Sequence, residues 1–233
     1  MKDPRLAKLA TLLVEHSTAI KPGDTVLIEA FDIPTNFTAC LIHAIAQAGG
    51  LPMVATHHQE VLRALYQCAS DEQMRTIGEI ESARMSATQC YIGVRGTNNI
   101  SEMSDVPSDK MKLYEQHWWT PVHSEIRVKK TRWVVLRWPT SSMAQSAGMS
   151  TEAFEDFYFD VCTGVDYKKM AAASLPLKEL MDRTDRIHIT GPGTDLSFSK
   201  KGIDSVPCSG ECNVPDGELF TCPVRDSVNG VIQ

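Results

Sequence analysis

Three groups of residues in this sequence could carry chemistry: a set of cysteines, a pair of histidines and an acid in a turn. The cysteines Cys208, Cys212 and Cys222 lie close together along the chain. A structural zinc site uses four ligands, often in paired C-x₂₋₄-C units. One C-x₃-C pair, a lone third cysteine and no nearby histidine fall short of that set. Three ordinary thiols are therefore the favoured interpretation.

The adjacent histidines His57 and His58 follow an apolar run that has the length of a strand. Ligands of α/β proteins bind at the carboxyl ends of strands, so this position is a candidate. No H-E-x-x-H or similar companion accompanies the pair, which favours a structural or solvent-facing role. His188 lies inside an alternating strand pattern and has no partner that the pattern identifies.

The acid lies in the turn Pro215-Asp216-Gly217, which leads directly into Glu218. Proline fixes φ and glycine permits the bend, so PDG is a strong turn signal. A glutamate at the first strand residue after a turn can point into a cleft. Taken alone, however, Glu218 is better interpreted as an exposed charge at the edge of a strand. The sequence contains no G-x-S-x-G elbow and no glycine loop with nucleotide-binding spacing.

The composition is that of a globular protein of 233 residues, with 42% apolar residues and a formal net charge of −6. This charge argues against a nucleic-acid-binding protein with a broad basic surface. The densest basic run, Arg127–Arg132 (RVKKTR), is interpreted as a solvated helix end. No apolar stretch has the length of a membrane span. Lys8 and Glu15 interrupt the apolar residues near the N-terminus, which argues against a signal peptide. Seven scattered cysteines in such a chain indicate reduced thiols in a cytoplasmic protein.

The elements that must position these residues alternate between strand-like and helix-like patterns. Short buried strands separated by helix-length segments are predicted at 25–30, 51–56, 90–96 and 132–138. That alternation predicts parallel strands joined by helical crossovers, a three-layer α/β sandwich with a mostly parallel sheet.

The pattern changes after Arg186. Residues 141–185 are predicted to be mostly helical, with Ser150 as a helix N-cap. The segments 186–190, 195–199 and 218–224 are short and alternating, which predicts antiparallel strands. We therefore expect an N-terminal α/β domain at 1–186 and the start of a second domain at 187–233.

Several segments, in order along the chain, together resemble the aminopeptidase T / aminopeptidase S family of metal-dependent exopeptidases. The resemblance is carried by KPGDTVLIEA (21–30), QAGG (47–50), WPTSSMAQSAGMSTEAFEDFYFD (138–160), ITGPGTDLSFS (189–199) and NVPDGELFTCPVRDSVNG (213–230). The PDGE-x-F-T-x-P segment is the most distinctive of them. Cys222 departs from the small residue that the family pattern places before the proline, and we do not assign it as a ligand.

The resemblance implies a hydrolase that removes N-terminal residues from peptides. The family has an N-terminal α/β domain and a catalytic domain that holds two divalent metal ions (zinc, cobalt or magnesium). Its ligands are two glutamates, a tyrosine, two histidines and an aspartate, and the first glutamate corresponds to Glu218. The resemblance places the other ligands and the catalytic glutamate beyond position 233. Tight metal sites need three or more protein ligands. We therefore expect no catalytic residue in this chain, a second domain that is truncated, and no activity of the chain alone.

Two further expectations come from the same patterns. Strands after residue 186 would present an unpaired edge, which predicts association into a homodimer. The alternative to an aminopeptidase is a non-catalytic α/β module that binds a small ligand or a partner at the carboxyl ends of its strands. In that case His57–His58 and Arg95–Asn99 are the segments that would form the site.

Overall fold

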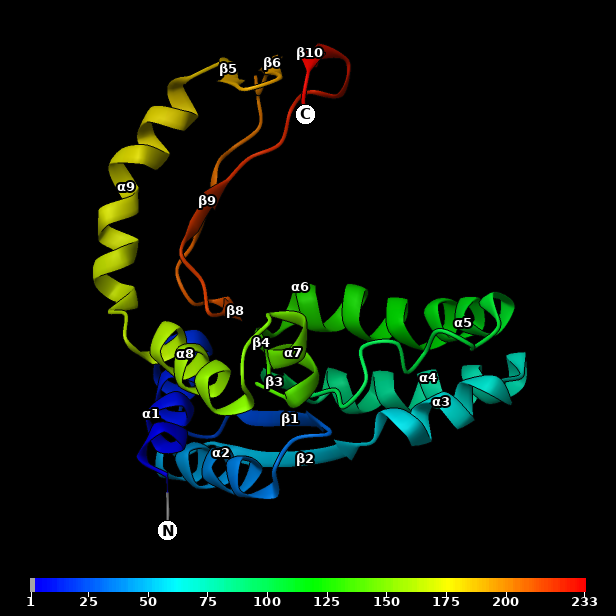
Figure 1. The fold of residues 1–233 in the computed structure, drawn as a ribbon. Helices are drawn as coiled ribbons and strands as arrows, with labels where there is room; N and C mark the ends of the chain where they lie inside the picture. The colour runs from blue at the N-terminus through cyan, green and yellow to red at the C-terminus, as the bar shows by residue number, and fades with distance from the viewer. Residues whose placement is uncertain (1–2) are drawn as a thin grey trace. The chain divides into compact units, whose positions relative to one another are not determined.

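The computed structural model describes residues 3–233, and its largest element is a five-stranded sheet (Figure 1). The strands run in the order β2-β1-β3-β4-β8, and every neighbouring pair is parallel. Their bounds are β1 (Thr25–Phe31), β2 (Leu51–His57), β3 (Cys90–Arg95), β4 (Arg132–Arg137) and β8 (Cys212–Val214). The four strands predicted from the first 140 residues are confirmed, whereas β8 was not predicted.

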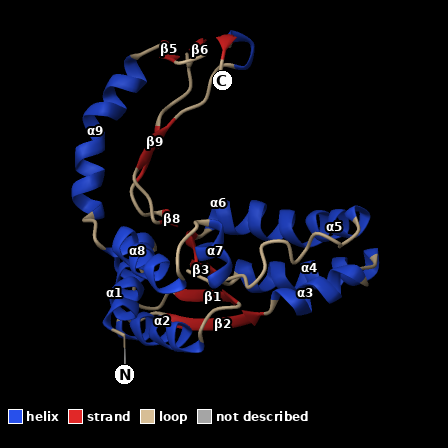
Figure 2. Cartoon of the chain, in the orientation of Figure 1, coloured by secondary structure: helices blue, strands red, loops and turns tan. Residues whose placement is uncertain are grey.

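Helices cover both faces of this sheet, so the predicted three-layer α/β architecture is confirmed (Figures 1 and 2). On one face, residues of α1 (Pro4–Leu12), η1 (Leu13–Ser17), α2 (Thr35–Gln47) and α8 (Thr151–Thr163) form a core with strands β1, β3 and β4. Its members Phe37, Leu41 and Ile45 are fully buried. Each such side chain contributes about 1.5–3 kcal/mol relative to exposure.

The opposite face carries a second core. It is formed by α3 (Gln59–Gln67), α4 (Asp71–Ser86) and a long helical segment that spans 108–130. That segment consists of α5 (Ser108–Tyr114), η2 (Glu115–Arg127) and α6 (Val128–Lys130). The middle part, η2, is a π-helix with Pro121 inside it. Proline has no backbone N–H to donate to the helix, and i→i+5 turns are one way in which a helix adapts to such an irregularity.

Helix caps in the second half of the α/β unit follow the sequence. The short helix α7 (Ser141–Ser146) precedes α8, and the Ala153 amide donates a 3.2 Å hydrogen bond to Oγ of Ser150. This confirms Ser150 as the N-cap of α8, an interaction that contributes about 1 kcal/mol.

The remaining residues form one further helix and small antiparallel sheets. Helix α9 (Tyr167–Arg183) leads into the hairpin of β5 (Arg186–Gly191) and β6 (Thr194–Ser199), which β10 (Asn229–Val231) extends. A separate ribbon pairs β7 (Val206–Cys208) with β9 (Glu218–Phe220), and η3 (Arg225–Ser227) is a short 3₁₀ turn. The predicted antiparallel pairing is confirmed. The predicted strand at 218–224 is too long, however, because β9 ends at Phe220, three residues before Pro223.

The chain divides into two compact units. The first unit contains residues 1–165 and 211–215, and the second contains 166–210 and 216–233. This division begins at Asp166, whereas the domain boundary expected at residue 186 stays a prediction. Within 3–233, no helix is long and apolar enough to cross a membrane.

Candidate functional site

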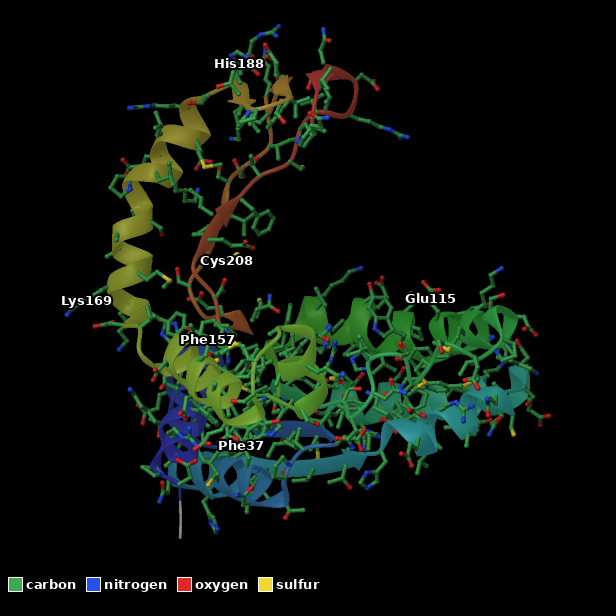
Figure 3. All side chains as sticks on the ribbon, viewed as in Figure 1. Phe37, Glu115, Phe157, Lys169, His188 and Cys208 are labelled. Atoms are coloured by element: carbon green, nitrogen blue, oxygen red, sulfur yellow. The ribbon has the colours of Figure 1, made fainter. Side chains whose placement is uncertain are left out.

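Glu218 is the first residue of β9 and lies opposite Cys208 of β7, which is labelled in Figure 3. The preceding turn is held by Asp216. Its carboxylate accepts hydrogen bonds from the amides of Gly210 (3.0 Å) and Gly217 (2.9 Å). Glu218 itself is exposed, and no described residue forms a hydrogen bond or ion pair with its carboxylate. The turn therefore fixes the backbone while the acid remains accessible.

The other candidate ligands do not gather around Glu218. Within the described part of the chain, no group of three or more histidine, cysteine, aspartate or glutamate residues is placed to hold a metal ion. None of Cys208, Cys212 and Cys222 forms a disulfide. One carboxylate does not hold a two-metal centre, so the residues present do not by themselves fit one.

His188 has the partner that the sequence pattern did not identify. Its Nε2 lies 2.9 Å from Oδ1 of Asp195 on the neighbouring strand of the β5–β6 hairpin (Figure 3). Both side chains are more than half exposed. A pair in this position stabilises the hairpin modestly and is not a metal site.

The two segments expected to form the site of a ligand-binding module, His57–His58 and Arg95–Asn99, come together at the carboxyl ends of β1, β2 and β3. His58 Nδ1 lies 3.0 Å from Oδ1 of Asp32, and the Gln59 amide donates a 2.9 Å hydrogen bond to Oδ2. Asp32, directly after β1, thereby caps the start of α3. A cavity of about 220 Å³ lies here, lined by Asp32 and His58 together with Asn98 and Asn99. A second cavity of about 270 Å³ shares Asp32 and His58 and also contacts His57.

The same unit contains a buried polar cluster that the sequence patterns did not predict. Glu29, in the middle of β1, is 2% exposed, and its Oε2 accepts a 2.6 Å hydrogen bond from the hydroxyl of Tyr91. Gly93, opposite Glu29 in the sheet, makes room for the tyrosine, because a Cβ there would lie 2.8 Å from the phenol ring. Arg84 approaches Oε1 of Glu29 to 3.6 Å and His57 approaches it to 3.8 Å.

The electrostatics of this cluster keep Glu29 ionised. Burial would raise the pKa of Glu29, but the nearby imidazoles of His57 and His123 and the hydroxyl of Tyr91 outweigh it and lower the pKa to about 2. Burial, helped by the charges of Arg127 and Arg95, lowers the pKa of His123 to about 4. At neutral pH the cluster therefore contains a carboxylate and a neutral imidazole.

Arg127 corrects the interpretation of the basic run. It is 6% exposed, with its guanidinium carbon 4.3 Å from the ring centroid of Trp133 and 5.4 Å from that of Tyr91. Only Lys129 and Lys130, in the last turn of the helix, behave as the predicted solvated end. A glutamate inside the apolar run TVLIEA was the one sequence signal for this cluster.

The comparison with protein families shows to which family the chain belongs. Residues 2–233 match the family described as thermophilic metalloprotease (M29). The chain belongs to the peptidase M29 family. The resemblance inferred from the sequence segments is thereby confirmed.

Solved structures agree on the fold of this M29 chain. Wild-type AmpT from Thermus thermophilus superposes with a TM-score of 0.80 at 20% sequence identity, covering 97% of this chain and 63% of AmpT. A 2,5-dihydroxypyridine dioxygenase from Pseudomonas putida KT2440 superposes with a TM-score of 0.56 at 11% identity, covering 99% of this chain and 59% of the dioxygenase. At these identities the likeness shows the fold alone. No curated protein matches the sequence.

The M29 chain spans less than two thirds of the length of either solved structure. The dioxygenase shows that this architecture also occurs in a protein with a different named activity. Function must therefore be argued from residues and not from the fold.

Proposed function

We propose that this chain is the N-terminal part of a metal-dependent aminopeptidase that removes N-terminal residues from peptides. Membership of the M29 family is the observation that carries this proposal. The accessible carboxylate of Glu218, held at a strand end by a hydrogen-bonded turn, supports it. Glu218 is the first ligand of a two-metal centre, and the family resemblance places the remaining ligands outside this sequence.

Divalent metal ions (zinc, cobalt or magnesium), held mainly by residues outside this sequence, would supply Lewis-acid chemistry for peptide hydrolysis. The role of this chain's own residue is narrower. Glu218 supplies an anionic oxygen donor of the type that such ions accept. The Asp216 hydrogen bonds set the direction from which that donor approaches. In this proposal the chain alone has no activity.

The experiment compares Glu218→Gln with Glu179→Gln, an exposed glutamate on α9 in the same unit. Both variants are made in the product of the gene's full coding region and assayed with leucine-p-nitroanilide and added Co²⁺ or Zn²⁺. Glu218→Gln should abolish cleavage and weaken metal binding, whereas Glu179→Gln should do neither. Unchanged activity in Glu218→Gln would show that Glu218 is no ligand. Cleavage by the 233-residue chain itself would refute the claim that it is inactive.

The proposal includes a homodimer and a cytoplasmic location. Strand β5 forms one edge of its three-stranded sheet, and an exposed edge can pair with a second copy. None of the seven cysteines forms a disulfide, which is the usual state in a reducing compartment. A monomeric mass by light scattering at working concentration would argue against the dimer.

A second candidate function, binding of a small ligand at the carboxyl ends of the strands, is favoured by the convergence on Asp32. The strand order reverses between β1 and β3, and such switch points are where open α/β sheets bind ligands. A thermal-shift screen of small amines and amino acids tests it. Stabilisation that disappears in Glu102→Gln, which alters the cavity wall, would favour this function over a purely structural role.

A further inference from the structure

A cavity of about 560 Å³ lies in the α/β unit at the amino ends of β3 and β4. Its wall includes Ser86 at the end of α4 and Thr88 just after it. It also includes Lys129 and Lys130 of α6, then Thr131 and the first residue of β4, Arg132. This end of the sheet is opposite to the one that holds Asp32, so the cavity is separate from the candidate sites above. Its volume falls within the roughly 300–1,000 Å³ of small-molecule sites.

The charged side chains that line this cavity are positive, whereas the protein as a whole is negatively charged. Three cationic side chains line it and no carboxylate does, although the chain carries a net charge of −6. Lys129 is partly neutralised by Glu125, 2.5 Å away. Lys130 forms no ion pair with any of the residues 3–233. Lysines also stabilise helix C-termini, so their presence alone would not define a site.

Arg132 supplies the feature that a helix end does not explain. One nitrogen, Nη2, contacts both Asp24 and the sulfur of Cys90, the latter at 3.0 Å. The contact with Asp24 is an ion pair that offsets part of the Arg132 charge, and the two contacts together hold the guanidinium in place. Its Nε is buried and has no hydrogen-bond partner. That atom is too buried for a ligand to reach. The Arg132 side chain as a whole is 37% exposed, however, so an anion in the cavity can contact the accessible part of the guanidinium.

The backbone around the cavity does not provide a phosphate loop. The amides of Thr131 and Arg132 donate to the carbonyls of Arg127 and Gln89. The hydroxyls of Thr88 and Thr131 donate to carbonyls of the preceding turns, at 3.0 and 2.7 Å. Recognition of an anion therefore falls to the cationic side chains.

The cavity also has an apolar wall. Met85, 1% exposed, and Ile126 line it beside the charged groups. Met85 is already covered almost completely by the protein, so Ile126, which is half-buried, supplies the apolar surface that an anion with a small hydrocarbon part would cover.

We propose that this cavity binds a small organic phosphate, with Lys130 and Arg132 contacting the phosphate and Ile126 contacting the carbon skeleton. The proposal is independent of the aminopeptidase function, because it uses none of the residues assigned to that function.

The test is a titration of the full chain with phenyl phosphate, benzoate, inorganic phosphate and phenol at constant ionic strength, followed by amide NMR shifts. Phenyl phosphate should bind more tightly than inorganic phosphate, phenol should not bind, and the shifts should centre on residues 85–89 and 126–132. Stronger binding of benzoate than of phenyl phosphate would overturn the assignment to a phosphate.

The chain provides a matched control for the lysines. Lys129→Gln/Lys130→Gln and Lys168→Gln/Lys169→Gln each remove two adjacent, exposed lysines and change the charge equally. The first pair should weaken phenyl phosphate binding about tenfold, a loss expected for charge-assisted contacts, and the second should leave it unchanged. Equal weakening by both pairs would show general charge attraction and refute the site.

Ser86→Glu is the second variant, since it adds a carboxylate to the cavity wall without removing any contact that holds the fold. It should abolish binding while the melting temperature stays within a few degrees. Full binding in Ser86→Glu would also refute the site.

Discussion

The hydroxyl of Tyr91 donates a 2.6 Å hydrogen bond to the carboxylate of Glu29, and both side chains are almost completely buried in the α/β unit. A carboxylate at this depth is tolerated only when its oxygens are paired. The cluster around this hydrogen bond gives predictions about stability that do not depend on the proposed functions.

Tyr91→Phe should destabilise the protein by about 1.5–3 kcal/mol, the range for a hydrogen bond to a charged group. The substitution keeps the ring, so packing against His123 is retained. Urea denaturation measures the change. Tyr66→Phe, another buried tyrosine on this face, is the comparison, and an equal loss there would show that the Glu29 contact has no special role.

His123 should make stability depend on pH. Its pKa is lowered to about 4 from 6.5, so the unfolded chain takes up a proton between those values and the folded chain does not. Stability contributed by the neutral histidine is therefore complete above pH 6.5 and falls as pH drops to about 4, by on the order of 3 kcal/mol. In His123→Phe this slope between pH 6.5 and 4 should disappear in urea titrations at several pH values.

Glu29 contributes a separate loss at lower pH. Its pKa is lowered from 4.5 to about 2, so the stability that the carboxylate provides is present above 4.5 and is lost as pH falls toward 2. Glu29→Gln should flatten that part of the profile. Because the Glu29 charge raises the pKa of His123, the same variant should extend the His123 part to lower pH. A single unfolding slope that neither variant alters would contradict both assignments.

Gly93→Ala should cost about 1–3 kcal/mol, because the added methyl group would lie 2.8 Å from a fully buried ring. All three of its nearest neighbours are atoms of Tyr91. In a Tyr91→Leu background the same substitution should therefore cost little. Chemical denaturation of the two single variants and the double variant measures this coupling.

Replacing Asp32 by alanine should destabilise the protein more than replacing it by asparagine. Asp32 has a φ of +46°, which asparagine adopts more readily than alanine, and it accepts the Gln59 amide at the start of α3. Asp32→Ala should lose about 1–2 kcal/mol through the lost cap and the backbone strain. Asp32→Asn should lose less, since its oxygen can still accept. Equal losses in thermal melts would indicate that charge, and not capping, is what matters.

The sequence predicted the sheet well where a strand could be recognised by itself. TVLIEA, LPMVAT, CYIGVRG and RWVVLRW are apolar runs bounded by turn residues, and all became parallel strands. Strand β8 has three residues and joins β4 from about 75 positions downstream, so its pairing depends on tertiary contacts. No local pattern marks it.

The candidate residues were predicted less evenly, for a related reason. Glu218 could be placed at a strand end because PDG fixes the turn before it. Arg127 could not be distinguished from its neighbours Lys129 and Lys130, because burial depends on which way a helical residue points. Glu29 and Tyr91 are far apart in the chain, and the register of β1 and β3 brings them together.

The wide-turned helix η2 decides which way those helical residues point. Its buried residues are Trp118, Val122, His123 and Arg127, a spacing of four, one and four that suits i→i+5 turns. The extra residue in each of its turns therefore rotates the side chains that follow in the helix about the helix axis. Loss of one residue upstream of His123 would turn the imidazole and the guanidinium away from the sheet together. A single-codon deletion there would thus remove His123 and Arg127 from the cluster around Glu29 without changing the identity of any residue in that cluster.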